Sequence, residues 1–240
     1  MDGAGDVALN LVVMGPPGAG KGTQAERFAR DHGIPKISTG DILRDAVQHD
    51  TPLGRQVSAL MSSGQLVSDD LIIGIVKERL ARPDTERGFV LDGFPRTVPQ
   101  ADALDEVLAG RGPLIVVEIQ VPDEELVRRV RSRRICATCG RTVSAFSDDA
   151  THVARCESCG GELVSRSDDG ENTVRDRLKV YWRETRPMIA YYQSRPTYRV
   201  VNGAQAPERV REALVAAVAS ALGRPTTDTG GAATRPGSNA

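Results

Sequence analysis

Four short apolar runs are rich in β-branched side chains and have the length of buried strands: residues 7–14, 89–91, 114–121 and 198–201. Apolar positions with helical spacing occupy the segments between and after them. These segments are residues 22–31, 53–61, 70–80, 99–108, 123–133, 173–192 and 207–222. Because strands that alternate with helices favour a parallel sheet, we predict an α/β fold with helices on both faces of a mainly parallel sheet.

Two stretches interrupt this alternation. From residue 38 to 67 helical segments follow one another without a strand, and residues 134–169 are rich in Cys, Gly, Ser and Asp with little helical periodicity. We therefore expect two excursions from one core that spans residues 6–222. The last eighteen residues, 223–240, contain no Val, Ile, Leu or aromatic side chain. Burial cannot offset their ordering entropy, so we predict a disordered tail there and at residues 1–5.

Composition and charge narrow the class of protein. With 240 residues, 40% hydrophobic and 26% charged, the chain can bury a sizeable core. Its 31 Lys and Arg residues nearly balance 32 Asp and Glu residues, which excludes a protein that coats nucleic acid or an anionic membrane through its overall charge. No apolar run approaches the ~20 residues that span a bilayer, and no basic segment precedes the first run. We expect a cytoplasmic protein whose basic sites are local.

The four cysteines form two C-x2-C pairs, Cys136 with Cys139 and Cys156 with Cys159. Such pairs suit a tetrahedral zinc site with four thiolate ligands, or alternatively two disulfides. We favour zinc, because the sequence shows no export signal and the cytosol keeps thiols reduced. Four protein ligands leave no open position for water, so the ion would be structural and would stabilise a segment with few apolar residues.

The strongest local motif is GPPGAGKGT at residues 15–23, directly after the first predicted strand. Its G-x4-G-K spacing is typical of a phosphate-binding loop, in which backbone N–H groups and a helix N-terminus surround an anion and Lys21 reaches the outer phosphates. Gly22 stands where that motif usually has Ser or Thr, and the hydroxyl comes one position later at Thr23. Asp92 follows the apolar run 89–91. A carboxylate there typically holds magnesium, directly or through water, although it could also be a helix cap.

Five motifs together resemble the adenylate kinase family: GPPGAGKGT (15–23), TGDILR (39–44), GQLVSDDL (64–71), LDGFPRTVPQAD (91–102) and the two C-x2-C pairs. The resemblance extends from residue 7 to about residue 222. It implies a P-loop NTPase-type parallel sheet with two inserted flaps that close over the substrates, a monophosphate-binding flap at 38–67 and a zinc-bearing lid at 132–169. The implied activity is reversible phosphoryl transfer between ATP and AMP, giving two ADP and maintaining adenine nucleotide balance.

On the ATP side, the resemblance assigns contacts to the glycine-rich loop, to the lid and to the segments beside the lid. The implied ATP-binding residues are Gly18, Ala19, Gly20, Lys21, Gly22, Thr23, Arg129, Arg133, Thr142, Val143 and Gln205. An aromatic side chain is common in the family at the position of Val143, so this sequence departs from the pattern there. Gln205 would lie near the adenine of ATP and act through its backbone, and Asp92 would hold the magnesium of ATP through water.

On the AMP side, the resemblance implies a second and separate set of contacts. These residues are Thr39, Arg44, Gln65, Leu66, Val67, Gly93, Phe94, Pro95, Arg96, Gln100, Arg166 and Arg177. Arg44 and Arg96 would grip the acceptor phosphate with planar donor forks that lysine cannot copy. Gln100 would read the adenine edge with its amide, as both donor and acceptor, and Thr39 would favour adenine by its place against the ring.

The implied mechanism needs positive charge and no covalent nucleophile. A phosphate oxygen of AMP attacks the γ-phosphorus of ATP in line, with Mg²⁺ bound to ATP, while the lid excludes water so that ATP is not hydrolysed. Asp168 and Asp169 match acidic lid residues that organise the arginines. The implied catalytic residues are Lys21, Arg96, Arg133, Arg166 and Arg177.

Two alternatives remain open at this point. One is a kinase that acts on UMP or CMP, or that uses GTP as donor; Gln100 and the long Cys-bearing lid weigh against the pyrimidine substrates. The other makes the cysteine unit a nucleic-acid-binding ribbon on a regulatory NTPase, but among residues 136–159 only Arg141, Arg155 and Phe146 would suit such a surface. We expect a monomer that binds ATP, AMP and ADP and has no nucleic-acid or membrane partner.

Overall fold

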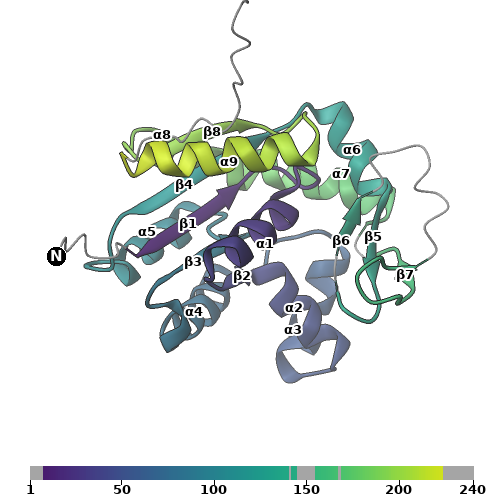
Figure 1. The fold of residues 1–240 in the computed structure, drawn as a ribbon. Helices are drawn as coiled ribbons and strands as arrows, with labels where there is room; N and C mark the ends of the chain where they lie inside the picture. Colours follow the sequence, from purple (N-terminus) through teal and green to yellow (C-terminus); the bar gives the residue numbers. More distant parts are fainter. Residues whose placement is uncertain (1–7, 141, 145–154, 167–168, 224–240) are drawn as a thin grey trace, which may run out of the picture.

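The central sheet has the strand order β2-β3-β1-β4-β8, and every neighbouring pair of strands is parallel (Figure 1). The computed structural model describes residues 8–140, 142–144, 155–166 and 169–223. The strands of the sheet are β1 (Leu9–Met14), β2 (Lys36–Ser38), β3 (Gly88–Asp92), β4 (Leu114–Gln120) and β8 (Tyr198–Asn202). This confirms the predicted parallel sheet.

Both faces of the sheet are buried, and successive residues of one strand contribute to opposite faces. In β1, Leu11 and Val13 pack with the helices of one face, whereas Val12 and Met14 pack with those of the other. A strand that is covered on both sides reads as a continuous apolar run rather than as an alternating one, which is how β1 and β4 were recognised in the sequence.

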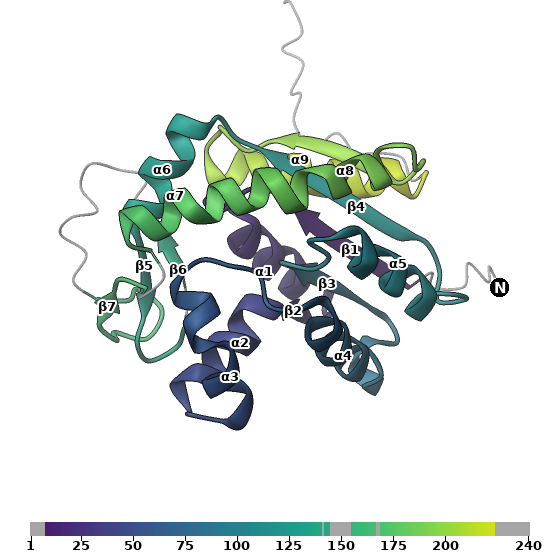
Figure 2. The ribbon, with the colours of Figure 1, turned by 180° about the vertical axis from the view of Figure 1, so that it is seen from behind.

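Helices α1 and α9 cover one face of the sheet, and α4, α5 and α8 cover the other (Figures 1 and 2). The helices are α1 (Lys21–His32), α2 (Thr39–Gln48), α3 (Pro52–Ser62), α4 (Asp69–Leu80), α5 (Val98–Val107), α6 (Asp123–Arg131), α7 (Glu171–Val180), α8 (Arg186–Gln193) and α9 (Pro207–Ala221). A 3-10 turn, Pro83–Thr85, precedes β3, and a π-helical turn, Tyr181–Thr185, joins α7 to α8. Within the described residues, no helix is both long enough and apolar enough to cross a bilayer.

A second, three-stranded antiparallel sheet lies apart from the first, in the order β6-β5-β7 (Figure 1). Its strands are β5 (Arg133–Cys136), β6 (Thr142–Ser144) and β7 (Leu163–Val164). On another side of the central sheet, α2 and α3 form a helical pair that projects away from the sheet in both views (Figures 1 and 2). Of the predicted tail at 223–240, only Gly223 belongs to the described part of the chain; its other residues and residues 1–5 lie outside it.

The elements differ from the sequence prediction in several places. The strands β2, β5, β6 and β7 were not predicted, because runs of two to four residues carry little periodicity. The helix predicted at 123–133 ends at Arg131, and Arg133 already belongs to β5. The helix predicted at 173–192 begins at Glu171 and is interrupted by the π-helical turn, in which i→i+5 hydrogen bonds replace i→i+4 bonds over five residues, too short a stretch to be evident in the sequence pattern.

Register places the functional loops at one edge of the central sheet. Val13 of β1 and Ser38 of β2 both pair with Asp92, the last residue of β3. Because parallel strands end on the same side, the glycine-rich loop, the start of α2 and the loop after β3 meet at this edge. The carboxyl ends of parallel strands are where ligands bind in open α/β sheets.

Candidate active site

The glycine-rich loop connects β1 to α1 and packs closely against the backbone of β4. Gly15 has a φ of +142°, and a Cβ there would lie 2.5 Å from the backbone oxygen of Ile119, so only glycine fits. Lys21 is the first residue of α1, and its Nζ donates to the backbone oxygen of Pro16 at 3.0 Å. The loop therefore presents a helix N-terminus and an ammonium group to the same space.

Lys21 has an unusually low pKa. Burial lowers it most, the carboxylate of Asp92 partly opposes that effect, and the nearby guanidinium groups of Arg96, Arg177 and Arg133 lower it further, to about 8. Burial and like charges both disfavour a charged ammonium, so an anion bound among these groups would raise the pKa of Lys21 again. The charges around Lys21 thus favour an anionic ligand.

Gly22 explains how this loop departs from the usual motif. A Cβ at Gly22 would lie 3.1 Å from Oδ2 of Asp92, a tight approach that the glycine avoids. The Asp92 carboxylate therefore sits directly against the first turn of α1. It lines the same cleft as Lys21 and Thr23. A carboxylate beside a phosphate loop is chemically suited to hold a magnesium ion through water.

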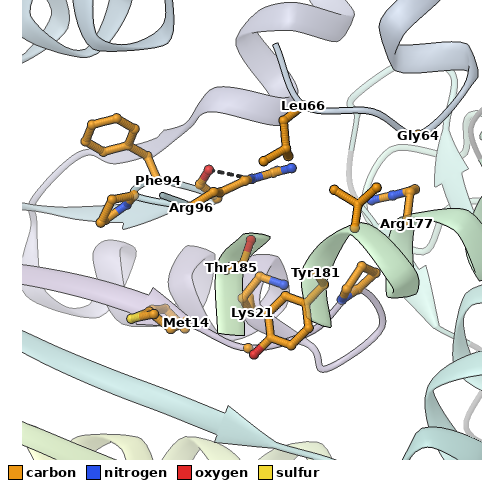
Figure 3. A pocket seen from close by; sticks show the side chains of 15 residues that line it. Met14, Lys21, Gly64, Leu66, Phe94, Arg96, Arg177, Tyr181 and Thr185 are labelled. Carbon is orange, nitrogen blue, oxygen red and sulfur yellow. Dashed lines mark hydrogen bonds between the residues drawn. The ribbon is translucent and has the colours of Figure 1, made fainter. Parts of the chain in front are cut away.

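A small pocket of about 70 Å³ lies where three basic side chains from different elements meet. Figure 3 shows Lys21 from α1, Arg96 from the loop after β3 and Arg177 from α7 reaching into it. Phe94, Pro95 and Leu66 form part of its wall. Three cations that converge on a pocket with no Asp or Glu in its described lining favour a polyanion such as a phosphate chain.

The loop after β3 is fixed by hydrogen bonds to one carbonyl. The backbone oxygen of Gly93 accepts from Nε of Arg96 at 2.8 Å and from Oγ1 of Thr39 at 2.9 Å. Thr39 itself is the first residue of α2 and is buried. These contacts hold the Arg96 guanidinium at the entrance of a second pocket of about 60 Å³, next to the first.

This second pocket contains most of the residues assigned to AMP by resemblance. It is lined by Thr39, Arg44, Gln65, Leu66, Val67, Gly93, Arg96, Gln100 and Arg177, together with Gly40, Leu43, Met61, Gly64 and Ile72. Gly64 was not assigned, although a Cβ there would lie only 2.8 Å from Cγ of Arg177, so glycine admits that side chain.

Arg44 forms an ion pair with Asp41, a residue that was not predicted to belong to the site. Its Nη2 donates to Oδ1 of Asp41 at 2.5 Å, and Nζ of Lys36 lies 3.2 Å from the other carboxylate oxygen. Burial raises the pKa of Asp41, but Arg44 and Lys36 outweigh it, so the pKa lies well below its usual range. The i, i+3 spacing of Asp41 and Arg44 on one helix was a usable signal for this pair.

The arginines beside the small sheet are bound to a buried carboxylate. Asp169 accepts two hydrogen bonds from Arg133 and one, at 3.3 Å, from Nη1 of Arg177. Arg166 donates to Oγ1 of Thr142 at 3.0 Å. Asp169 therefore joins β5 to α7, while Asp168 lies outside the described residues.

The remaining residues assigned to ATP are less uniformly placed. Arg129 is buried and donates to the backbone oxygen of Gly203 at 2.9 Å and to Glu125 at 2.8 Å, yet it also lines the cleft. Gln205 is exposed and its Nε2 donates to the backbone oxygen of Asn202 at 3.3 Å, outside the residues that line the cleft. Val143 lies in β6, but its side chain is not part of the described structure.

A large cleft of about 1010 Å³ joins these features. The glycine-rich loop forms one wall; α2, with Asp41 and Arg44, forms a second; and the small sheet, with Ile135, forms a third. Its described lining has eleven Lys or Arg side chains against five Asp or Glu side chains. In a chain of net charge −1, this concentration of basic side chains favours anionic ligands in the cleft.

The four cysteine side chains meet in the small-sheet region. All four Sγ atoms lie within 4.8 Å of one another, with Cys136 and Cys159 at 3.4 Å and Cys139 and Cys156 at 3.7 Å. These separations are far longer than the ~2.05 Å of a disulfide bond. They approach the roughly 3.7 Å expected between thiolates on a tetrahedron with zinc–sulfur distances of ~2.3 Å.

The two C-x2-C segments have the same local geometry. Gly140 donates its N–H to the backbone oxygen of Cys136 at 2.9 Å, and Gly160 donates to that of Cys156 at 2.7 Å. Both glycines have positive φ, 67° and 72°. The Cys139 N–H, 3.4 Å from the sulfur of Cys136, is the main cause that lowers the pKa of Cys136, whereas the hydrogen bond with Cys136 raises the pKa of the Cys159 thiol. Turns of this kind present thiolates that suit a zinc ion.

Comparison with known proteins identifies the family. The family model of adenylate kinase matches residues 13–197. Three similar relatives carry the name adenylate kinase, from Geobacter sp. (strain M21), Archaeoglobus fulgidus and Moorella thermoacetica. Their identities are 50% over 88% of this chain and 99% of the relative, 49% over 81% and 91%, and 45% over 90% and 99%. The chain therefore belongs to the adenylate kinase family.

Proposed function

We propose that the cleft of this adenylate kinase is where it transfers a phosphoryl group reversibly between ATP and AMP, giving two ADP. The observation that carries this assignment is the convergence of Lys21, Arg96 and Arg177, from three different elements, on one pocket. The glycine-rich loop lies on one side of that pocket, and the pocket lined by Thr39 and Gln100 lies on the other. Two phosphate-bearing ligands placed there would meet end to end.

In the proposed mechanism, the protein positions the phosphates and neutralises their charge. An oxygen of the AMP phosphate forms a bond to the γ-phosphorus of ATP, and the bond from that phosphorus to the bridging oxygen breaks, which releases ADP. Lys21 follows the transferring phosphoryl group, while Arg44 and Arg96 hold the acceptor phosphate. Arg133, Arg166 and Arg177 supply further positive charge from the lid side of the cleft.

Magnesium bound with ATP would reduce the negative charge of the phosphate oxygens, and Asp92 would hold it through water. The carboxylate lies against Gly22 at the edge of the cleft, where oxygen ligands can reach a phosphate chain.

The zinc proposed for Cys136, Cys139, Cys156 and Cys159 would be structural, because the thiolates fill all four positions of a tetrahedral site. It would stabilise the small sheet.

We also propose that residues 38–67 and 132–169 act as two flaps over this cleft. Support comes from α2 and α3, which project away from the central sheet (Figure 1), from the separate sheet of β5, β6 and β7, and from the cleft lining, to which one segment contributes Asp41 and Arg44 and the other Ile135 and Arg166. Closure would exclude water from the transferring phosphoryl group and so suppress hydrolysis of ATP. We further propose that the enzyme is a cytoplasmic monomer.

The substrate assignment is tested by initial rates of ADP formation from ATP with AMP, CMP or UMP as acceptor. We expect a strong preference for AMP, because Gln100 offers both a donor and an acceptor to the base. Equal rates with the three acceptors would refute the AMP assignment. Incubation with ADP alone should yield ATP and AMP, since the reaction is reversible.

The site assignment is tested by Arg96→Ala. The variant should lose nearly all phosphoryl transfer, by about 10² to 10³-fold, because a charge-assisted contact to the acceptor phosphate disappears. Its thermal unfolding should remain near that of the parent chain, since the variant loses the side-chain hydrogen bond to the backbone oxygen of Gly93, which still accepts from Thr39. Near-normal turnover would show that the acceptor site lies elsewhere.

A further inference from the structure

The side-chain amide of Gln100 lies between two groups whose hydrogen-bonding roles are fixed. Its Oε1 accepts from the backbone N–H of Arg96 at 2.8 Å, and its Nε2 donates to Oδ1 of Asp69 at 2.7 Å. A backbone N–H can only donate, and an ionised carboxylate can only accept. Rotating the amide by 180° would therefore set donor against donor and acceptor against acceptor, so these partners impose one orientation.

The locked amide keeps half of its hydrogen-bonding capacity for a ligand. A glutamine amide has two N–H groups and two acceptor lone pairs, and Asp69 and Arg96 use one of each. Gln100 is 2% exposed and lines the pocket proposed for AMP. Any unmet donor or acceptor on a ligand base is costly at such a buried position.

The orientation of this amide decides which purine it matches. The edge of adenine offers a donor at N6 and an acceptor at N1, whereas hypoxanthine and guanine offer the reverse, an acceptor at O6 and a donor at N1. An amide that could turn over would satisfy both kinds of base. An amide that is held in one orientation satisfies one kind and leaves unpaired groups with the other.

We propose that Asp69 is a positioning residue for base selection, which holds the Gln100 amide in the orientation that accepts adenine and rejects 6-oxopurines. The proposal rests on the AMP site proposed above and adds a residue outside the set assigned to AMP. Asp69 does not need to touch the nucleotide. It acts through Gln100, and the N–H of Arg96 acts from the other side of the same amide.

Asp69 also has a second contribution that any test must separate. It is the first residue of α4, where a negative charge interacts favourably with the positive end of the helix. Asp70, the next residue, is exposed and lies in the same first turn, yet the contact to Gln100 belongs to Asp69. Asp70→Asn is therefore a matched control that removes the same charge and leaves the amide locked.

The decisive measurement is the ratio of kcat/KM for AMP to kcat/KM for IMP, with saturating ATP. In Asp69→Asn, whose side chain can donate as well as accept, we expect this ratio to fall about tenfold or more, mainly through KM. Asp69→Glu, which keeps the acceptor, should retain most of the selectivity, and Asp70→Asn should equal the parent chain. An unchanged ratio in Asp69→Asn, or an equal fall in Asp70→Asn, would overturn the proposal.

A double-mutant cycle separates this proposal from the site on which it rests. In a Gln100→Ala background, Asp69→Asn should have no further effect on KM for AMP or on the ratio, because the amide it orients is gone. A parental KM for AMP in Gln100→Ala would instead show that the AMP site is misplaced. If Gln100→Ala raises that KM while Asp69→Asn leaves the ratio intact, only the role of Asp69 fails.

Discussion

At the scale of single residues, Lys21 shows how the charges of the cleft suit a phosphate ligand. Burial, with the nearby arginines Arg96 and Arg177, lowers the pKa of its ammonium to about 8 from the ordinary value of 10.5, and Asp92 only partly opposes this effect. A bound triphosphate would supply the missing negative charge and raise the pKa again. Binding of ATP should therefore be linked to the protonation of this one side chain.

We predict that ATP binding takes up a proton at Lys21 when the pH is above about 8. Well below pH 8 the ammonium is already protonated in the free enzyme, so binding changes nothing; above pH 8 the free enzyme has lost the proton and the complex regains it. Titration calorimetry in two buffers of different ionisation enthalpy, at pH 6.5 and pH 8.5, measures this uptake.

Lys21→Arg is the control for proton uptake, because a guanidinium stays charged at both pH values. The variant should bind MgATP without the extra uptake at pH 8.5, whatever its affinity. If the parent chain takes up no more protons on binding MgATP at pH 8.5 than at pH 6.5, the proposed linkage is wrong.

The residues whose placement could be predicted were those that belong to local motifs. Lys21 follows from the G-x4-G-K spacing, because a loop between a strand and a helix fixes where that lysine lies. The role of Asp69 could not be predicted, since its partner Gln100 is 31 positions away. An acidic residue at the start of a helix is also common, because it interacts favourably with the helix N-terminus. For Gln205 the assignment rested on resemblance alone, and its side chain lies outside the cleft lining.

At the scale of elements, the pair α2 and α3 depends on one close approach of two backbones. A Cβ at Gly54 of α3 would lie 2.0 Å from the backbone oxygen of Ala46 in α2. Because backbone cannot yield as a flexible side chain can, Gly54→Ala should destabilise the chain by about 1–3 kcal/mol and raise KM for AMP. Urea unfolding and initial rates measure the two effects.

Gly74→Ala in α4 is the matched control, because Gly74 is exposed and nothing lies within 4 Å of a Cβ there. Alanine is the better helix former, so the free energy of unfolding of this variant should exceed that of the parent chain by about 0.5–1 kcal/mol. Equal stabilities for Gly54→Ala and the parent chain would show that α2 and α3 can separate without cost.

The small sheet β5–β7 should depend on metal rather than on apolar burial. Its strands have two to four residues each, too few to form a core of their own. We predict about one zinc ion per chain, measured by mass spectrometry, and a lower Tm after chelation. Cys139→Ser should lose the metal, whereas Glu157→Gln, exposed between two cysteines, should keep it. A metal-free preparation with parental Tm would contradict this.

Sequence pattern predicted the long elements well and the short ones poorly. The apolar run of β4 has seven residues and α9 has fifteen, so both carry enough positions for their periodicity to be evident. Strand β2 has three residues and β7 has two, and each forms because a neighbouring strand supplies its hydrogen bonds. Such elements follow from tertiary pairing rather than from their own residues.

At the scale of the whole molecule, the fold was predictable because alternation is a property of the entire chain. Four apolar runs separated by helical segments permit few arrangements of the chain. A sheet of parallel strands covered by helices is the arrangement that buries every one of these runs. The shape of the cleft was not predictable in the same way. It depends on where α2, α3 and the small sheet sit relative to the glycine-rich loop, and that placement arises from packing between distant segments.

The cleft also concentrates the charge of a nearly neutral molecule, and this predicts how the enzyme responds to salt. Arg30 lines the cleft and is exposed, whereas Arg87 is exposed and lies outside the described cleft lining. Raising KCl from 0.1 M to 1 M shortens the Debye length from about 10 Å to about 3 Å. KM for both nucleotides should therefore rise several-fold, while kcat changes less, because transfer occurs among enclosed charges.

Arg30→Gln and Arg87→Gln change the net charge equally and separate a local field from a global one. Arg30→Gln should raise KM for both nucleotides at 0.1 M KCl and make these KM values less sensitive to salt. Arg87→Gln should have the KM values of the parent chain at both KCl concentrations. Thermal unfolding at each KCl concentration checks that the fold is intact. If the two variants behave alike, the cleft field does not guide the nucleotides, and the arginines act only through direct contacts with bound phosphate.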